Sequence, residues 1–258
     1  MRKVLLVLTL TALATLTALP AGAIVDGVPD GDGHPMVGAV VGEFDGVKDW
    51  FCSGTLIAPK VFLTAGHCTE VFDAYGLEDA WVTFDPVFDA DASKFWHGTW
   101  ITHPAYSPNT LANDVGLIIL DKAVKKVTPA TLPTLKLLDQ MKRDGTIDDE
   151  LYKNVGYGGT AEFTGGPPTV TYDGIRRVSY SPYGSLTQGN LHLQSNSNEP
   201  DTGGTCFGDS GGPHFYGDSL LLVSVTSWGD AICRSNDMTQ RVDIRSVQDF
   251  LDDYVTLS

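Results

Sequence analysis

The amino-acid sequence predicts an all-β protein. Short runs rich in Val, Ile, Leu and Thr recur between clusters of Gly, Pro, Asn and Asp, and the chain has 28 glycines and 14 prolines to form turns. Helical periodicity between these runs is nearly absent, so a parallel sheet with crossover helices is not expected. Many short strands without intervening helices are typical of an antiparallel sandwich or barrel.

Five expected strands show this pattern of short apolar or alternating runs, and they are spread over the whole chain: Val37–Val41, Thr55–Ile57, Val61–Thr64, Val115–Leu120 and Leu220–Thr226. After removal of the leader described below, 235 residues remain, which suits one large β domain or two barrels of about 110 residues. Pro and Thr are concentrated around Thr128–Pro133. We therefore place a domain boundary there, between residues 24–130 and 131–258.

A helix is expected to close the chain. Ser246 is placed to cap its first turn, with Asp249 three residues further on. Four side chains at i, i+3, i+4 and i+7 spacing would dock this helix onto a barrel: Val247, Phe250, Leu251 and Tyr254. A second, weaker helical stretch is expected around Leu135–Lys142.

The first 23 residues have the pattern of a secretory signal peptide. Arg2 and Lys3 precede Val4–Leu19, an uncharged run of 16 residues, and small residues follow. The alternative is a membrane anchor, but that run is shorter than the roughly 20 residues that a spanning helix needs. We therefore expect an exported, extracellular protein that begins at Ile24 after cleavage behind Ala23.

The mature chain would be strongly acidic, with 15 basic against 32 acidic residues once the two basic residues of the leader are removed. Such a surface repels nucleic acid and anionic membranes, so neither is an expected partner. The acidic residues are scattered along the chain, which is typical of an ordinary soluble surface.

Four cysteines follow the leader. An exported protein favours disulfides over free thiols, and no CxxC spacing suggests a zinc or redox site. Four cysteines allow three pairings, and spacing alone does not choose between them. Joining neighbours in sequence gives Cys52–Cys68 and Cys206–Cys233 as the provisional expectation.

Three polar residues suggest chemistry only when they are taken together. Ser210 lies in TCFGDSGGPHF, residues 205–215, and its hydroxyl would need an adjacent base to become a nucleophile. His67 directly follows an apolar strand, and Asp114 opens the apolar run NDVGLIIL, where a carboxylate needs hydrogen-bond partners. Separately, each has a structural interpretation: a surface turn, a structural histidine and a turn aspartate.

In this order, TAGHC, NDVGLIIL and GDSGGP resemble the signature blocks of the chymotrypsin/trypsin-like serine protease family. IVDG is similar to the family's mature start, VGYGG to its Gly-aromatic-Gly segment and SWGDAIC to its substrate-binding strand. The resemblance covers nearly all of residues 24–258. It implies two six-stranded antiparallel β-barrels packed face to face, with a C-terminal α-helix, the histidine and aspartate in the first barrel and the serine in the second.

The resemblance implies a secreted serine endopeptidase that needs no cofactor and acts on protein or peptide substrates. Ser210 would attack the scissile carbonyl, His67 would transfer protons and Asp114 would orient the imidazole. The backbone N–H groups of Gly208 and Ser210 would form the oxyanion hole. A monomer is expected, and proteinaceous inhibitors are further expected partners.

The resemblance also implies an activation pair. Asp209 would bind the α-ammonium group of Ile24, which cleavage of the signal would expose with no remaining propeptide. The enzyme would then be active upon export. The alternative is a cleavage site elsewhere that leaves a short propeptide.

The substrate pocket departs from the family pattern. Its floor would lie at Gly204 and Thr205, and trypsin-like members carry an aspartate at the position of Gly204. Asp237, opposite Gly204, offers a negative charge that would select a basic P1 residue, the one whose carbonyl is cleaved; the alternative is an exposed loop aspartate. The wall would be formed by Ser227, Trp228 and Gly229.

Other functional interpretations are incomplete or open. GDSGG satisfies the G-x-S-x-G motif of α/β-hydrolases, but only His214 follows Ser210, four residues on. Gly217–Leu220 spells a lipase-like GDSL with no histidine after it. A catalytically silent member of the fold, which binds or regulates, is the remaining alternative. The acids after His67 do not match a calcium loop, so no metal site is expected: Glu70, Asp73, Glu78 and Asp79.

Overall fold

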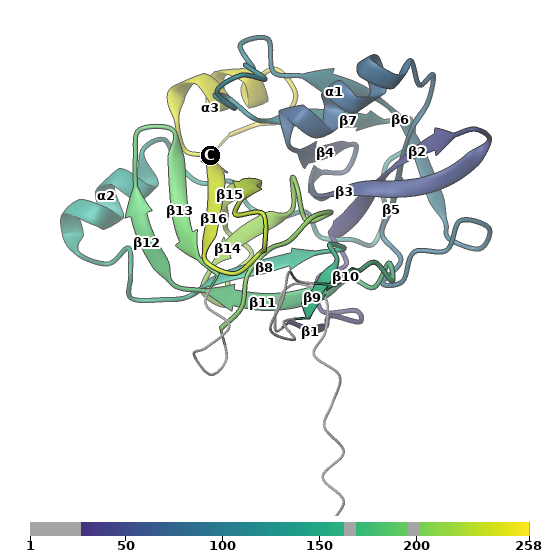
Figure 1. The fold of residues 1–258 in the computed structure, drawn as a ribbon. Helices are drawn as coiled ribbons and strands as arrows, with labels where there is room; N and C mark the ends of the chain where they lie inside the picture. The colour runs from purple at the N-terminus through teal and green to yellow at the C-terminus, as the bar shows by residue number, and fades with distance from the viewer. Residues whose placement is uncertain (1–26, 163–168, 196–201, 258) are drawn as a thin grey trace, which may run out of the picture.

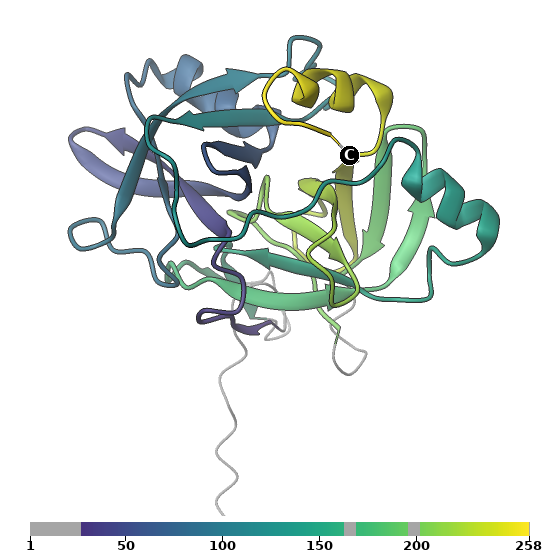
Figure 2. The ribbon, with the colours of Figure 1, turned by 180° about the vertical axis from the view of Figure 1, so that it is seen from behind.

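A computed structural model describes residues 27–162, 169–195 and 202–257 of the chain (Figure 1). The expected signal peptide, residues 1–23, and Ile24 lie outside the described residues. The described part is mostly β, as the sequence predicts, and forms two β units that lie side by side (Figures 1 and 2).

The first unit is a closed antiparallel barrel with the strand order β2-β3-β4-β7-β6-β5. Its interior is filled by fully buried apolar side chains such as Val40, Leu56, Phe62 and Leu117. The six-stranded barrel expected here is confirmed, and its strands are β2 (Val37–Phe44), β3 (Val47–Ala58), β4 (Val61–Thr64), β5 (Ala80–Thr83), β6 (Phe95–Thr102) and β7 (Gly116–Leu120).

The second unit is a curled eight-stranded sheet with the order β1-β11-β8-β14-β15-β16-β13-β12. Strand β1 pairs antiparallel with β11, so the N-terminal segment joins the second unit. A separate hairpin joins β9 (Thr160–Glu162) to β10 (Thr169–Thr171). The eight strands are β1 (Val28–Pro29), β8 (Tyr152–Gly156), β11 (Arg177–Ser181), β12 (Tyr183–Leu186), β13 (Asn190–Gln194), β14 (Pro213–Tyr216), β15 (Leu222–Gly229) and β16 (Asn236–Arg241).

Two helices among the described residues precede the C-terminal helix. Helix α1 (Gly66–Tyr75) follows β4 directly and was not expected from the sequence; it ends at Gly76, whose positive φ of 62° suits glycine. Helix α2 (Leu137–Asp144) lies close to the weaker helical stretch expected around residues 135–142. No helix among the described residues has the length and apolar content needed to cross a membrane.

The C-terminal helix α3 (Arg245–Asp252) is confirmed, but its expected cap is wrong. The helix begins two residues earlier than expected, with Ile244 at the capping position, so Ser246 lies inside it and donates from Oγ to Asn113 Oδ1 at 2.7 Å. Val247, Phe250 and Leu251 are buried as expected and pack against the core that contains the first barrel. Tyr254, expected in the same stripe, lies beyond the helix and is exposed.

Residues 121–136 connect the two units and cross the face of the molecule that is turned toward the viewer in Figure 2. Ala130 N donates to Leu56 O of the barrel at 2.9 Å, and Thr131 N donates to Leu220 O beside the sheet at 3.0 Å. The connecting segment is therefore hydrogen-bonded to both units.

A buried guanidinium fastens the N-terminal segment between the units. Arg176 is 1% exposed, and its Nε donates to Asp30 Oδ2 at 2.8 Å. Asp30 also binds His34 Nδ1 at 2.6 Å. The remaining guanidinium hydrogens are directed at acceptors from the N-terminal segment, the barrel and the second unit: the carbonyl oxygens of Gly31, Val37 and Phe84 and the hydroxyl of Tyr157.

Candidate active site

His67 and Asp114 meet because the strands before and after them are neighbours. Strand β4 leads into α1 and pairs with β7, with Thr64 opposite Gly116, so the start of the helix faces the residue that precedes β7. Asp114 Oδ1 accepts the backbone N–H of His67 at 2.8 Å, and Oδ2 lies 2.9 Å from His67 Nδ1. A carboxylate only accepts hydrogen bonds, so Nδ1 carries the proton and Nε2 is left as the basic nitrogen.

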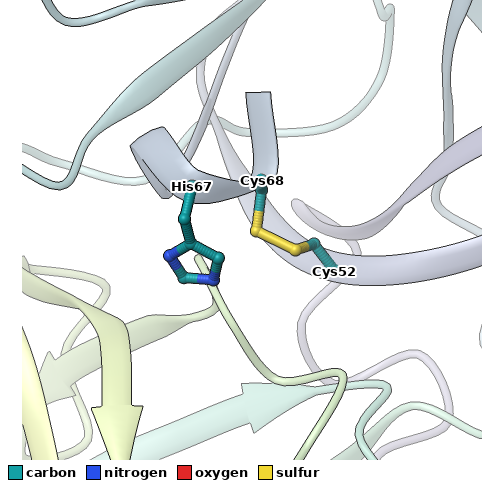
Figure 3. Close-up of side chains that lie close together, drawn as sticks. All are labelled: Cys52, His67 and Cys68. Atoms are coloured by element: carbon teal, nitrogen blue, oxygen red, sulfur yellow. A yellow bond between two sulfur atoms is a disulfide. The ribbon is translucent and has the colours of Figure 1, made fainter. Parts of the chain in front are cut away.

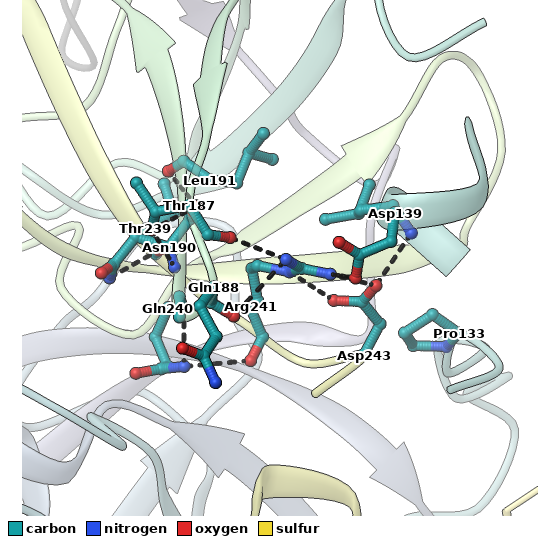
Figure 4. A network of polar contacts seen from close by, with 12 residues as sticks. Pro133, Asp139, Thr187, Gln188, Asn190, Leu191, Thr239, Gln240, Arg241 and Asp243 are labelled. Carbon is teal, nitrogen blue, oxygen red and sulfur yellow. Dashed lines mark hydrogen bonds and ion pairs between the residues drawn. The ribbon is translucent and has the colours of Figure 1, made fainter. Parts of the chain in front are cut away.

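Two further residues hold Asp114, which is fully buried. Ser227 Oγ donates to Oδ2 at 2.5 Å, and Asp114 N donates to Gln240 Oε1 at 3.0 Å. Gln240 is itself fixed, because its Nε2 donates to the carbonyl oxygens of Gly189 and Arg241 (Figure 4). Sequence reasoning missed Gln240, which lies 126 positions from its partner.

Behind Gln240, an ionic network fastens β16 to helix α2 (Figure 4). The buried guanidinium of Arg241 donates to Asp243 Oδ1 at 2.8 Å and to Asp139 Oδ2 at 2.6 Å. Asp243 also accepts the backbone N–H of Leu138 at 2.8 Å. The network therefore fixes the backbone on which Gln240 is carried.

Ser210 lies in the turn before β14, pressed against the first barrel. Ser53 N donates to the Ser210 carbonyl oxygen at 2.8 Å, and the Cys68 sulfur lies 3.6 Å from the same oxygen. Ser210 is half-buried, and its hydroxyl makes no hydrogen bond to another described residue. Catalytic hydrogen bonds are often long in enzymes without substrate and shorten when the complex forms.

The expected disulfide between Cys52 and Cys68 is present and holds α1 against β3 (Figure 3). Both sulfurs lie within 4.8 Å of a ring nitrogen of His67. Because the two sulfurs are bonded to each other, they are not thiolates, and this cluster is not a metal site. The disulfide instead fixes the helix turn that carries the imidazole.

The backbone around Gly208 favours an outward N–H. Gly159 N donates to the Phe207 carbonyl oxygen at 2.8 Å, and in a trans peptide the following N–H, that of Gly208, points the opposite way. Gly208 has a φ of +97°, and a Cβ there would lie 3.0 Å from Gly158 Cα. Within the described residues, neither the Gly208 nor the Ser210 N–H donates to another group.

Asp209 is buried beneath this turn. Its carboxylate accepts Gly158 N at 2.8 Å and Cys206 N at 2.9 Å. Burial raises its pKa to about 7, although these two N–H groups and the charge of Arg177 oppose the rise. A Cβ at Gly158 would overlap the carboxylate, which explains the glycine there. The expected partner, the α-ammonium of Ile24, lies outside the described residues.

A pocket of about 210 Å³ opens beside Ser210. Thr205 and Thr226, which are 9% and 5% exposed, are among its lining residues. Gly204 is buried, and a Cβ there would overlap the side chain of Ser195. The second expected disulfide, Cys206–Cys233, joins two segments of the pocket wall. The expected wall residues also line it: Ser227, Trp228 and Gly229.

Asp237 lies behind this pocket. It is in strand β16, directly opposite Gly229, and its side chain is fully buried, so the alternative of an exposed loop aspartate is wrong. Neither carboxylate oxygen has a hydrogen-bond partner of normal geometry among the described residues. Burial raises its pKa to about 7; the nearby Thr205 hydroxyl opposes the rise, and the charge of Asp209 adds to it.

Two other hollows were not expected from the sequence. One of about 340 Å³ shares Phe207 and Gly208 with the candidate site and is lined by Asp49, Trp50, Phe51 and Tyr172. The other, of about 1140 Å³, is a groove between helices α2 and α3 and the β12–β13 turn, and Asn113 and Gln240 are among its lining residues.

Comparisons with known proteins identify the family and the fold of this chain. A family model described as Trypsin matches residues 29–251. The chain is 28% identical over 241 residues to Lectizyme of Glossina austeni, covering 85% of this chain and 81% of that protein. It is 28% identical to Brachyurin of Leptuca pugilator (70% and 77% covered) and 29% identical to Trypsin of Saccharopolyspora erythraea (78% and 84% covered).

Solved structures share the fold. HL collagenase superimposes with a TM-score of 0.68 at 21% identity, covering 89% of this chain and 97% of that one. Human heparin binding protein superimposes with a TM-score of 0.68 at 20% identity, covering 91% and 99%.

Proposed function

Because this chain belongs to the trypsin family of serine proteases, we propose that it is a secreted endopeptidase that hydrolyses peptide bonds through an acyl-enzyme intermediate. The observation that carries the proposal is the pair of hydrogen bonds that His67 donates to Asp114, from its backbone N–H and from Nδ1, which leave Nε2 as the basic nitrogen. Relatives named as proteases support the same class of reaction.

In the proposed mechanism, Ser210 Oγ attacks the scissile carbonyl carbon while His67 Nε2 takes its proton. Asp114 holds the imidazole and stabilises the cation that forms. The N–H groups of Gly208 and Ser210 bind the oxyanion, a contribution of roughly 3–4 kcal/mol for each donor in comparable sites. His67 then protonates the leaving amine, and a water molecule, activated by the same histidine, hydrolyses the acyl-enzyme.

The substrate would bind as an added antiparallel strand along Ser227–Gly229, with its P1 side chain in the 210 Å³ pocket. Asp237 behind that pocket supports a preference for a positively charged P1 residue. Protein inhibitors would occupy the same cleft. We propose that the enzyme acts as a monomer.

The activation pair remains part of the proposal. Asp209 is buried with two N–H partners and no cation within bonding distance in the described residues. An α-ammonium group at residue 24 would balance its charge and hold the turn that carries Gly208. Sequencing the secreted protein tests this step, and a first residue other than Ile24 would contradict it.

A fluorophosphonate probe tests the proposed function. The mature chain should be labelled at Ser210, and Ser210→Ala should abolish labelling and lower turnover by roughly six orders of magnitude. Ser219→Ala is the matched control, because this exposed serine belongs to the GDSL sequence and should be dispensable. Folded, correctly processed protein that is not labelled would instead favour a binding or regulatory protein, a class of function that human heparin binding protein shows to be compatible with the fold.

A further inference from the structure

A buried group of polar side chains lies between the substrate pocket and the interior of the second unit. Strands β8, β11, β14, β15 and β16 contribute to it, and all of its members are at most 5% exposed: Asn154, Ser179, Ser181, His214, Thr226 and Asp237. Thr226 also lines the pocket, so the group is one residue away from a bound P1 side chain.

The hydrogen bonds in this group have fixed directions. Ser181 Oγ donates its one hydrogen to the Gly203 carbonyl at 2.9 Å, so it must accept from Asn154 Nδ2 at 2.8 Å. Asn154 Nδ2 donates its second hydrogen to Ser179 Oγ at 3.0 Å. The amide oxygen of Asn154 is therefore the atom that faces His214 Nδ1 at 2.7 Å, and His214 must carry its proton on Nδ1.

This tautomer leaves His214 Nε2 as an acceptor. Thr226 Oγ1 donates to it at 2.9 Å, and burial lowers the pKa of His214 to about 3, so the ring is neutral. The same Nε2 lies 3.5 Å from Asp237 Oδ2. An acceptor nitrogen opposite a carboxylate oxygen offers no hydrogen bond to an ionised Asp237.

The other neighbours of Asp237 in the described part of the chain offer no compensating cation. The residues directly opposite it on the adjacent strands are Gly229 and Leu193, which do not titrate. In the turn before β14, the Thr205 hydroxyl lies close by, and the carboxylate of Asp209 adds a repulsive charge. An ionised Asp237 would thus be a buried charge whose one nearby donor is the Thr205 hydroxyl, and this is costly unless a proton or a cation neutralises it.

We propose that Asp237 is a proton-linked cation site: its carboxyl keeps a proton in the empty pocket and releases it to solvent when a cationic P1 side chain binds. His214 is the specificity-determining residue that, locked as an acceptor, denies the carboxylate a donor. This inference rests on the proposed function for the identity of the ligand, a lysine or arginine side chain.

The proposal predicts how affinity for a cation depends on pH. With a pKa of about 7 for Asp237, the affinity should rise about tenfold per pH unit below that value and level off above it. Between pH 5 and pH 8 the gain should approach 90-fold, because the ionised fraction of the carboxyl rises by that factor. An uncharged P1 side chain should show no such gain.

Isothermal titration of Ser210→Ala with benzamidine, a small aromatic cation, tests the proposal without requiring catalysis. Titrations in two buffers of different ionisation enthalpy should show about one proton released at pH 5.5 and almost none at pH 8.5. Benzamide, the uncharged analogue, should bind equally at both values. Asp237→Asn should abolish the proton release, which assigns it to this carboxyl rather than to Asp209, and His214→Gln, whose amide can donate, should move the transition to lower pH.

Equal benzamidine affinity from pH 5.5 to 8.5 without proton release would overturn the proposal, as would benzamide binding as tightly as benzamidine at pH 8.5. If neither ligand binds while the fluorophosphonate labels Ser210, the cation site is refuted and the proteolytic function stands. If benzamidine binds with proton release but no labelling occurs, the cation site stands and the proteolytic function is refuted. The titration of Ser210→Ala decides the matter even where Asp237→Asn or His214→Gln does not fold.

Discussion

Replacing Arg176 by methionine should destabilise the protein strongly. The guanidinium is 1% exposed, and the Asp30 side chain beside it is 2% exposed. Burial opposes ionisation of Asp30, but the hydrogen bonds and charges of His34 and Arg176 outweigh it and hold the pKa of Asp30 below its usual value. Arg176→Met leaves that buried charge with His34 as its remaining charged partner and removes the guanidinium donor from three backbone carbonyls.

The expected loss is about 3–5 kcal/mol of unfolding free energy, the range for removing one partner of a buried ion pair. Because a depressed pKa stabilises the folded state only above the unfolded value of 3.8, this contribution should disappear as the pH falls through the folded pKa. The double variant Asp30→Asn/Arg176→Met should recover on the order of 2 kcal/mol, since it removes the buried charge that has lost its guanidinium partner.

Urea denaturation followed by tryptophan fluorescence measures these values, in a Ser210→Ala background that prevents self-cleavage. Arg245→Met is the matched control, because this side chain is 71% exposed and lies 3.5 Å from Asp249; its cost should stay within about 0.5 kcal/mol. If Arg176→Met costs no more than this control, the buried ion pair does not stabilise the N-terminal segment and the reasoning fails.

Three further outcomes follow from the site. Gln240→Leu removes the acceptor of the Asp114 N–H and should lower kcat/KM about tenfold or more. Gln240→Glu keeps an acceptor but gives up both Nε2 donations and buries a second carboxylate beside Asp114, so it should lose at least as much; steady-state kinetics on a peptide substrate measures both, and an unchanged kcat/KM in Gln240→Leu would contradict the role of Gln240. Gly204→Ala places a methyl group against the side chain of Ser195 and should lower the melting temperature by several degrees. Gly189→Ala, where a Cβ meets nothing within 4 Å, is the control and should leave the melting temperature unchanged; equal shifts in the two variants would contradict the packing argument. Burial raises the pKa of Asp209 to about 7, above its unfolded value. A chain that retains its first 23 residues should therefore lose about 2–3 kcal/mol of unfolding free energy between pH 5 and pH 8, relative to a chain that begins at residue 24 and can form the ion pair. If the unfolding free energies of the two chains change in parallel with pH, the ion pair between Ile24 and Asp209 is contradicted.

The strands were predictable where the sequence alternates or runs apolar between turn residues. Val61–Thr64 matches β4 in both bounds. Helix α1 was not predictable in the same way, because it follows a strand without a break and its packing depends on the disulfide to β3. Strand β1 is two residues long and exposed, and only its pairing with Val178 makes it a strand.

The candidate site was predictable to the extent that local motifs carry it. The motifs around His67, Asp114 and Ser210 can each be recognised from a few consecutive residues. The roles of Gln240 and His214 cannot, because each depends on a hydrogen bond to a residue far away in the sequence, and the residues next to them do not indicate that partner. The burial of Asp237 also depended on β16 pairing with β15, which short-range pattern does not reveal.

Ser53 belongs to the first barrel, yet it donates and accepts hydrogen bonds that shape the nucleophile turn of the second unit. Its N–H holds the Ser210 carbonyl at 2.8 Å, its hydroxyl donates to the Gly208 carbonyl at 2.9 Å, and the same oxygen accepts Tyr157 N at 2.9 Å. The conformation of the nucleophile turn therefore depends on contacts between the first barrel and the second unit. Cleavage of the connection at residues 121–136 would leave these hydrogen bonds in place, whereas the second unit produced alone would carry Ser210 without the Ser53 bonds that hold its turn.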